Sequence, residues 1–351
     1  MTEIFLTIFF ITVLLLFLGS GIWVAISMIG VSSIGMMLFT TRPVGDAMAT
    51  TIWGASSSWT LTALPLFVWM GEILFRTKLS ENLFEGLSPW MQKLPGGLVH
   101  VNVVGCALFA AISGSSAATV ATVGKMSIPE LRKRKYPESI LLGSLAGSGT
   151  LGLLIPPSII LIIYGVTVQE SIAKLFIAGI LPGIMIALIF MTYVIIWSSI
   201  NKKLMPVSKQ NFSFIEKFRK SGKLIPVILL ILSVIGSIYT GIATATEAAS
   251  LGVVGALILS YFQKSLTLKT FKASLLGATK TSCMIAFILA GATFLSLAMG
   301  FTGLPRNLAI WIESMDLSPY VLIFVLMIFY IILGMFLDCL LYTSPSPRDT
   351  L

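Results

Sequence analysis

Residues 147–158 read GSGTLGLLIPPS and lie at the centre of an apolar run, 139–166, that is long enough to cross a membrane. Pro156 and Pro157 have no backbone N–H to donate, and Pro157 also clashes with a preceding helical turn. The glycines of residues 147–152 weaken a helix further, because glycine loses the most conformational freedom when it is fixed. The stretch therefore predicts a membrane helix that is broken at its centre.

A helix broken inside a membrane exposes carbonyl oxygens and the ends of two half-helices, where secondary transporters bind ions and substrates. A proline kink that binds nothing is the alternative interpretation. The preceding apolar run, 97–123, favours a binding site, because its centre at residues 112–119 reads ISGSSAAT and is also a poor helix centre.

The rest of the chain has the composition of an all-α polytopic membrane protein. Of its 351 residues, 56% are apolar and 11% are charged, whereas a soluble domain carries about 25% charged residues. The first run is too apolar and too poor in N-terminal charge for a cleaved signal, so we expect a retained helix. Runs that reach or approach the length of a membrane span cover residues 4–18, 22–40, 60–76, 97–123, 139–166, 171–199, 224–241, 243–262, 281–302 and 320–337.

Residue types that serve catalysis or bind transition metals are scarce. His100 is the single histidine and the three cysteines are scattered, so we expect neither a Cys/His metal site nor a disulfide framework. The serines of 113–116 have no neighbouring base, which argues against a membrane-embedded enzyme. The chain contains no GxxxxGK[ST] phosphate-binding loop, which argues against an ATP-driven pump.

The basic residues predict the orientation in the membrane. Nineteen of the 23 lysines and arginines fall in residues 76–96, 125–138, 201–223 and 263–280, and the positive-inside rule places these four segments in the cytoplasm. We therefore attribute the net charge of +9 to topology rather than to nucleic-acid binding. The N-terminus is expected on the periplasmic side.

Two of these cytoplasmic segments flank the single run 97–123. One crossing would place the two ends of this run on opposite sides, so the run is predicted to enter and leave from the cytoplasm as a re-entrant hairpin. Its expected tip is at residues 112–119, because irregular backbone at membrane depth is tolerated only where protein or a wet cavity surrounds it. One ordinary helix whose small residues pack against a neighbour is the alternative.

The hairpin tip and the broken helix offer only neutral oxygen ligands. Such oxygens suit a hard cation such as Na⁺, whereas transition metals prefer the imidazoles and thiolates that are missing here. The candidate ligands are Ser113, Ser115, Ser116, Thr119, Gly149 and Thr150.

Two acidic residues, Glu247 and Asp338, border or enter apolar runs and are candidates for function, since acids inside a membrane are costly. For Glu247 a structural role remains open, because an acid in the first turn stabilises a helix N-terminus that Thr244 or Thr246 could cap.

A weak internal duplication predicts inverted repeats, a design common in secondary transporters. Residues 54–58 align with residues 277–281, and Asn82-Leu83 aligns with Asn307-Leu308. The first repeat covers about residues 54–200 and begins outside, whereas the second covers about 277–338 and begins in the cytoplasm.

The stretches SGSSAAT at 113–119, GTLGLLIPPS at 149–158 and TEAA at 246–249 resemble the large permease subunit of TRAP (tripartite ATP-independent periplasmic) transporters. The resemblance covers about residues 1–338. It implies Na⁺-coupled uptake of an organic acid across a bacterial or archaeal inner membrane, by an elevator mechanism and without a cofactor. It also implies two partners, a small four-helix membrane subunit and a periplasmic solute-binding protein. A stand-alone ion-coupled carboxylate transporter without a binding protein is the alternative.

The resemblance also assigns candidate site residues, and Glu247 then becomes a structural or coupling acid. Sodium binding is assigned to Ser113, Ser115, Ser116, Gly147, Gly149, Thr150 and Gly152, and substrate binding to Ser116, Thr119, Pro156, Pro157, Ser158 and Asp338. Which organic acid is carried cannot be read from these residues.

Residues 339–351 depart from the family pattern, because they are polar and contain two prolines, an arginine and an aspartate. The family continues here with a second hairpin tip and a second broken helix. We therefore expect a truncated permease with a non-native tail. The chain as given is expected not to transport, and the C-terminal portion of a close relative in place of 339–351 is expected to restore uptake.

The charge pattern yields a test of topology. Cysteines introduced as Lys78→Cys and Arg134→Cys should both react with a membrane-impermeant reagent only from the cytoplasm, since both positions lie in basic segments. Labelling of either cysteine from the periplasm would remove the argument for the hairpin.

Overall fold

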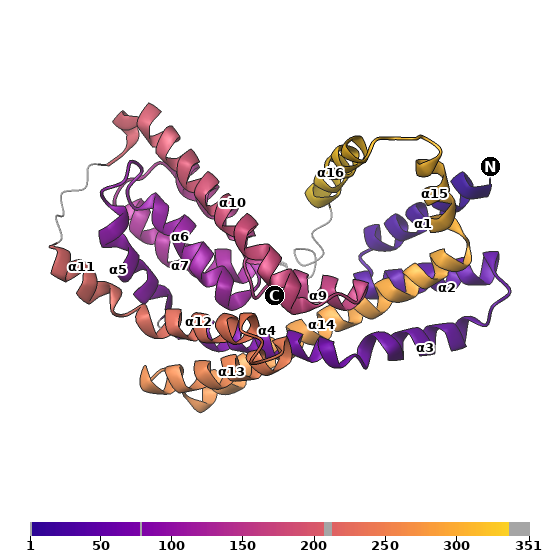
Figure 1. Ribbon diagram of the computed structural model, residues 1–351, viewed down its shortest axis with the longest axis horizontal. Helices are drawn as coiled ribbons and strands as arrows, with labels where there is room; N and C mark the ends of the chain where they lie inside the picture. The colour runs from indigo at the N-terminus through magenta and orange to yellow at the C-terminus, as the bar shows by residue number, and fades with distance from the viewer. Residues whose placement is uncertain (1, 78, 207–212, 337–351) are drawn as a thin grey trace. The chain divides into compact units, whose positions relative to one another are not determined.

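The computed structural model describes residues 2–77, 79–206 and 213–336 (Figure 1). Within these ranges the chain forms α-helices and short 3-10 helices and no strand. The prediction of an all-helical chain is confirmed. The described helices divide between two compact units, one of residues 2–58 and 283–336 and one within residues 59–282.

The first unit is built around a small core formed by Met36, Phe294 and Ala298. Gly35 lets Phe10 pack against the second helix, because a Cβ atom at this position would lie 2.6 Å from the Phe10 ring. The guanidinium of Arg42 lies over the Phe301 ring, 4.6 Å from the ring centre. The helices of this unit are α1 (Thr2–Gly19), α2 (Val24–Phe39), α3 (Val44–Ser56), the later part of α14 (Leu268–Phe301), α15 (Leu304–Glu313) and α16 (Pro319–Phe336).

The second unit contains most of the buried residues and all the described candidate site residues. Its elements are η1 (Trp59–Thr62), α4 (Ala63–Phe75), α5 (Leu79–Met91), α6 (Val99–Ser113), α7 (Ser116–Lys133), α8 (Glu138–Gly149), η2 (Thr150–Leu153), α9 (Ile159–Val168), α10 (Ile172–Ile200), η3 (Lys202–Leu204), α11 (Phe214–Ser221), α12 (Ile225–Tyr239), α13 (Ala245–Phe262) and the first part of α14.

Two groups of helices make up the core of this second unit. In one, α4 packs along α13, where Gly252 leaves room for Met70. In the other, α6, α7 and α8 pack on one another, around side chains such as Phe109 and Leu141 that are fully buried. Close packing in both groups follows from small residues that let helices approach each other.

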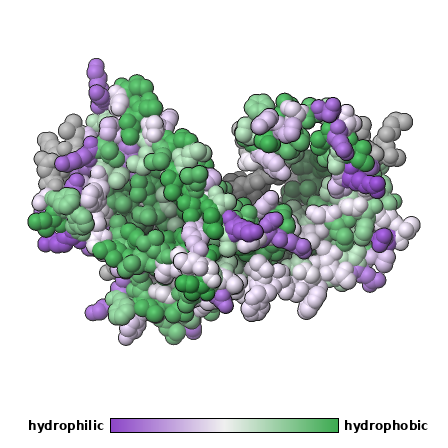
Figure 2. Space-filling model, viewed as in Figure 1, coloured by the Kyte–Doolittle hydropathy of each residue, from purple (hydrophilic) through white to green (hydrophobic). Residues whose placement is uncertain are grey.

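The outer faces of the long helices are apolar, as expected of surfaces that face lipid. Along α10, Leu181, Leu188 and Tyr193 are 77%, 56% and 57% exposed, and apolar side chains cover much of this unit in Figure 2. By length and composition α10, α13 and α14 can each cross a membrane, and shorter apolar helices include Val24–Phe39 and Val99–Ser113.

Helices continue beyond the apolar runs into the basic segments 125–138 and 263–280. Helix α7 extends to Lys133 and α14 begins at Leu268. Lysine and arginine are good helix formers, so a helix continues through charged residues where the apolar run has ended. Helices α3, α5, α11 and α15 were not expected from the apolar runs either.

Candidate functional site

The run 97–123 forms two helices that meet at a sharp turn, so a single straight helix is excluded. Helix α6 ends at Ser113, Gly114 adopts a left-handed conformation with φ +58°, and α7 begins at Ser116. Glycine is suited to this position because side chains are strained at positive φ. The predicted helical hairpin is therefore present, while its entry from the cytoplasm stays a prediction.

The predicted break in the run 139–166 is also present. Helix α8 ends at Gly149, one turn of 3-10 helix follows, and α9 begins only at Ile159. Ser158 ends the break, because its hydroxyl oxygen accepts the N–H of Leu161 and so caps α9. Between these helices Pro156 and Pro157 are buried and are joined by a cis peptide bond.

The hairpin tip and the break lie directly against each other. The N–H of Ile159 donates a hydrogen bond of 3.2 Å to the carbonyl oxygen of Gly114. At Gly152 a Cβ atom would lie 2.8 Å from the carbonyl carbon and oxygen of Ser115, so only glycine allows this approach. Gly149 likewise lies against Val120 of α7. Segments about 40 residues apart in the sequence thus form one structure.

Three candidate sodium ligands, Ser113, Ser115 and Thr119, cluster at the tip. The hydroxyl oxygens of Ser113 and Thr119 are 3.0 Å apart, and the Thr119 hydroxyl donates to the carbonyl oxygen of Ser115 at 2.7 Å. The backbone N–H of Ser115 donates to the Ser113 hydroxyl at 3.4 Å. The tip therefore holds several neutral oxygens close together, which is the ligand type that a hard cation prefers.

The other predicted sodium ligands are arranged around this cluster with different degrees of exposure. Thr150 is exposed and its hydroxyl donates to the carbonyl oxygen of Gly147 at 2.7 Å. Ser115 and Ser116 are half-buried, and Gly149 and Gly152 are buried. The structure places Gly152 against the Ser115–Ser116 backbone.

The predicted substrate residues do not form an open polar surface in this structure. Thr119 and Ser158 are fully buried, and the Ser158 hydroxyl donates to the carbonyl oxygen of Leu153. Ser116 is half-buried. Asp338 lies outside the described residues, as does the predicted tail, 339–351.

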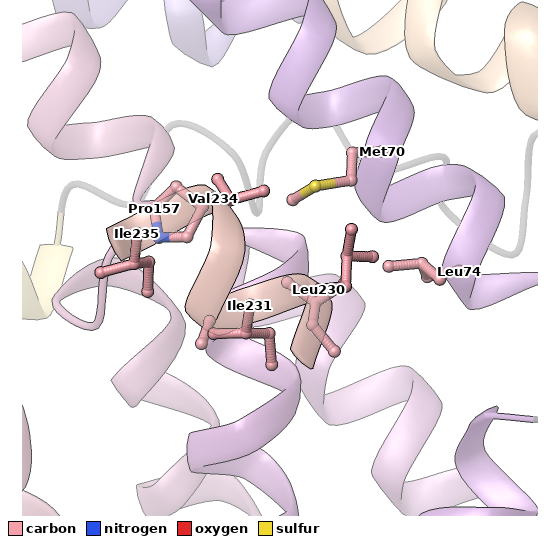
Figure 3. Close-up of a pocket in the computed structure, with 9 residues that line it drawn as sticks. Met70, Leu74, Pro157, Leu230, Ile231, Val234 and Ile235 are labelled. Atoms are coloured by element: carbon pink, nitrogen blue, oxygen red, sulfur yellow. The ribbon is translucent and has the colours of Figure 1, made fainter. Parts of the chain in front are cut away.

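Pro157 borders a small apolar pocket between α4, the end of α6 and α12 (Figure 3). The pocket has no space for a water molecule, and no polar side chain lines it, so it is a packing seam rather than a site for a carboxylate. Its lining residues are Met70, Leu74, Ala111, Ile112, Pro157, Leu230, Ile231, Val234 and Ile235.

Glu247 stabilises the start of α13. Its carboxylate accepts the backbone N–H and the hydroxyl of Thr244, both at 2.8 Å, while the Thr244 hydroxyl oxygen accepts the N–H of Glu247 at 3.3 Å. This reciprocal capping box satisfies backbone groups that a helix leaves free at its N-terminus. The geometry accounts for an acid at this position without a bound ligand.

Sequence reasoning missed a buried polar network behind the site. The side-chain amide of Asn102 on α6 donates to the Ser144 hydroxyl at 3.0 Å and to the carbonyl oxygen of Leu141 at 3.3 Å. The hydroxyl of Ser148, next to Gly149, donates to the backbone carbonyl oxygen of Ser144 in its own helix at 2.6 Å and to the Asn102 carbonyl oxygen at 3.4 Å. The bonds that involve Asn102 fix α8 against α6. The available signal was an asparagine inside an apolar run.

Comparison with known proteins gives a consistent match. Residues 10–343 match the family described as "Tripartite ATP-independent periplasmic transporter, DctM component". The C4-dicarboxylate TRAP transporter large permease protein of Pseudomonas aeruginosa is 32% identical over 304 residues, which cover 86% of this chain and 70% of that protein. The sialic acid TRAP transporter large permease protein of Vibrio cholerae is 31% identical over 326 residues, which cover 92% and 75%.

The close contact at Gly152 yields a test of the assembly of tip and break. Gly152→Ala should destabilise the protein by roughly 1–3 kcal/mol, because the added Cβ would displace the Ser115 backbone. Gly143→Ala on α8 is the matched control, since no atom lies within 4 Å of its Cβ position and alanine favours a helix by up to about 1 kcal/mol. Thermal unfolding in detergent measures both changes. Equal stability of Gly152→Ala and the parent would show that tip and break are not in contact.

Proposed function

The chain belongs to the family of the DctM component, the large permease, of tripartite ATP-independent periplasmic transporters, and on that premise we propose that it couples Na⁺ entry to the uptake of an organic acid. It is a multi-pass membrane protein, and we place it in the inner membrane. The observation that carries the proposal is the contact between the serine- and threonine-rich tip and the broken helix.

Sodium as the coupling ion is supported by the chemistry of this contact. Ser113, Ser115 and Thr119 bring hydroxyl and carbonyl oxygens within about hydrogen-bond distance of one another, and none of these groups carries a charge. A site of neutral oxygens attracts a small hard cation through the number and geometry of its dipoles, and coordination would replace the hydrogen bonds now made within the tip.

An organic anion as substrate is supported by the start of α9. A helix N-terminus carries a partial positive charge, and the break places this terminus beside the neutral oxygen cluster. A cation bound at the cluster would add further positive charge there. The relatives are named after several organic acids, including C4-dicarboxylates, sialic acid and 2,3-diketo-L-gulonate. We therefore propose an organic acid as the class of substrate.

We further propose an elevator mechanism in which the hairpin and the broken helix move together. The Gly114–Ile159 hydrogen bond and the close contact at Gly152 join these elements, so separating them would expose backbone groups at membrane depth. The family indicates two partners, a small membrane subunit and a periplasmic solute-binding protein that delivers the substrate. Both partners are proposals for this chain.

The test of coupling uses the hydroxyl groups of the site. Ser115→Ala and Thr150→Ala should each raise the Na⁺ concentration for half-maximal effect at least about tenfold, because a hydrogen-bonding or coordinating group next to a charge contributes roughly 1.5–3 kcal/mol. Two readouts apply. The first is the Na⁺-dependent rise in thermal stability of the 351-residue chain. The second is Na⁺-driven uptake in proteoliposomes that hold a relative's two partner proteins and the protein with its residues 339–351 replaced by the C-terminal portion of a close relative.

Thr192→Ala is the matched control, because Thr192 is also an exposed threonine whose hydroxyl bonds to its own helix, at 2.8 Å from the Leu188 carbonyl oxygen. It should leave the Na⁺ dependence unchanged. Unchanged Na⁺ dependence in Ser115→Ala and Thr150→Ala would assign both residues to packing. Uptake without the partner proteins would instead favour a stand-alone carboxylate transporter.

A further inference from the structure

Helix α11 exposes an apolar stripe that the described core leaves uncovered. The side chains of Phe214, Ile215 and Phe218 are 67%, 78% and 58% exposed. At 100° of rotation per residue these three positions fall within a 100° arc, so they form one face of the helix. An exposed apolar face of this kind marks a surface that meets a partner or a membrane.

Basic side chains border this stripe on both sides. On the same helical projection, Lys217 and Arg219 flank the apolar face, and Glu216 lies on the far side. The helix carries three basic residues and one acidic residue. An apolar stripe between basic residues is the arrangement found in helices that lie in the membrane interface, where long basic side chains reach the headgroups.

Contacts with α5 hold α11 in place. The Trp90 ring lies 6.2 Å from the Phe214 ring and 5.9 Å from the Phe218 ring, centre to centre, and the Lys217 ammonium lies 5.2 Å from the Trp90 ring centre. The Trp90 indole N–H donates to the Ser221 hydroxyl at 2.8 Å. An ion pair between Lys223 and Glu85 supports the same interface.

The direction of α11 fits a position at the membrane surface. Its axis is bent by 57° from that of α12, so if α12 runs along the membrane normal, α11 runs closer to the membrane plane. Tryptophan is enriched at membrane–water interfaces, and the positive-inside rule places the basic segment 201–223 in the cytoplasm.

We propose that α11, together with Trp90, binds the cytoplasmic surface of the bilayer at anionic phospholipids. Phe214, Ile215 and Phe218 insert among the acyl chains, and Arg219 and Lys217 lie at the lipid phosphates. Charge complementarity favours anionic lipid as the partner of this surface, because the excess of basic residues on α11 complements the negative charge of the cytoplasmic leaflet. A membrane subunit that covers the stripe is the competing occupant.

The first experiment measures depth in the membrane. The 351-residue chain is placed in lipid nanodiscs and carries a bimane label on the introduced cysteine of Ile215→Cys. The matched control carries the same label on Glu216→Cys, one position along the helix. Cys283 and Cys339 are first replaced by serine, whereas Cys106 is buried and stays. Lipid-borne doxyl groups should quench the label at 215 more strongly, and aqueous iodide should quench the label at 216 more strongly. Equal quenching of the two positions by iodide would overturn the proposal.

The second experiment tests the lipid charge. Doxyl-labelled phosphatidylglycerol should quench the label at 215 more than doxyl-labelled phosphatidylcholine at the same mole fraction. Arg219→Glu should reduce this preference by about threefold or more, since each basic residue near the surface contributes to attraction of anionic lipid. Lys133→Glu, an exposed residue of α7, changes the net charge equally and should have no effect.

Three results would contradict the proposal: no preference for phosphatidylglycerol, an equal loss in Lys133→Glu, or protection of position 215 from both quenchers once a relative's small subunit is added. The last result would identify the subunit as the occupant. The thermal midpoint of each labelled variant confirms folding, and Phe214→Cys replaces Ile215→Cys if that variant is unstable.

Discussion

The hydrogen bond from the Ile159 N–H to the Gly114 carbonyl oxygen is the interaction on which the site depends. The Gly114 carbonyl follows the end of α6 and the Ile159 N–H opens α9, so neither group has a partner in its own helix. Unpaired backbone groups inside a membrane cost several kcal/mol each. Pairing them satisfies both at once. The requirement for close approach then explains glycine at 114, where φ is +58°, and at 152, where a Cβ atom would overlap the Ser115 backbone.

Breaks and turns in this chain could be predicted from sequence because their signals are local. Proline at 156 and 157 and glycine at 114 act on their own backbone, whatever surrounds them. The ends of α7 and α14 could not be predicted from the apolar runs, because an apolar run marks where lipid contact ends and not where a helix ends. The bond between Asn102 and Ser144 could not be predicted, because it links two helices whose relative rotation is fixed only by packing.

The candidate site has two layers of polar groups. The hydroxyl groups of Ser113 and Thr119 bond within the tip. Behind them, bonds from the Asn102 side chain to Ser144 and from Ser148 to the Asn102 carbonyl oxygen hold α8 against α6. The candidate ligands could thus be proposed from the sequence, whereas the hydrogen bonds behind them could not.

The pairing of residues 114 and 159 has a consequence for how the protein is made. Residue 159 follows residue 114 by 45 positions. At a translation rate of about 5–20 residues per second, the tip is synthesised roughly 2–9 s before the start of α9, which completes it. During this interval the Gly114 carbonyl oxygen has no partner in the chain and must stay hydrated. The tip of α6 and α7 is therefore completed only after the start of α9 has been synthesised.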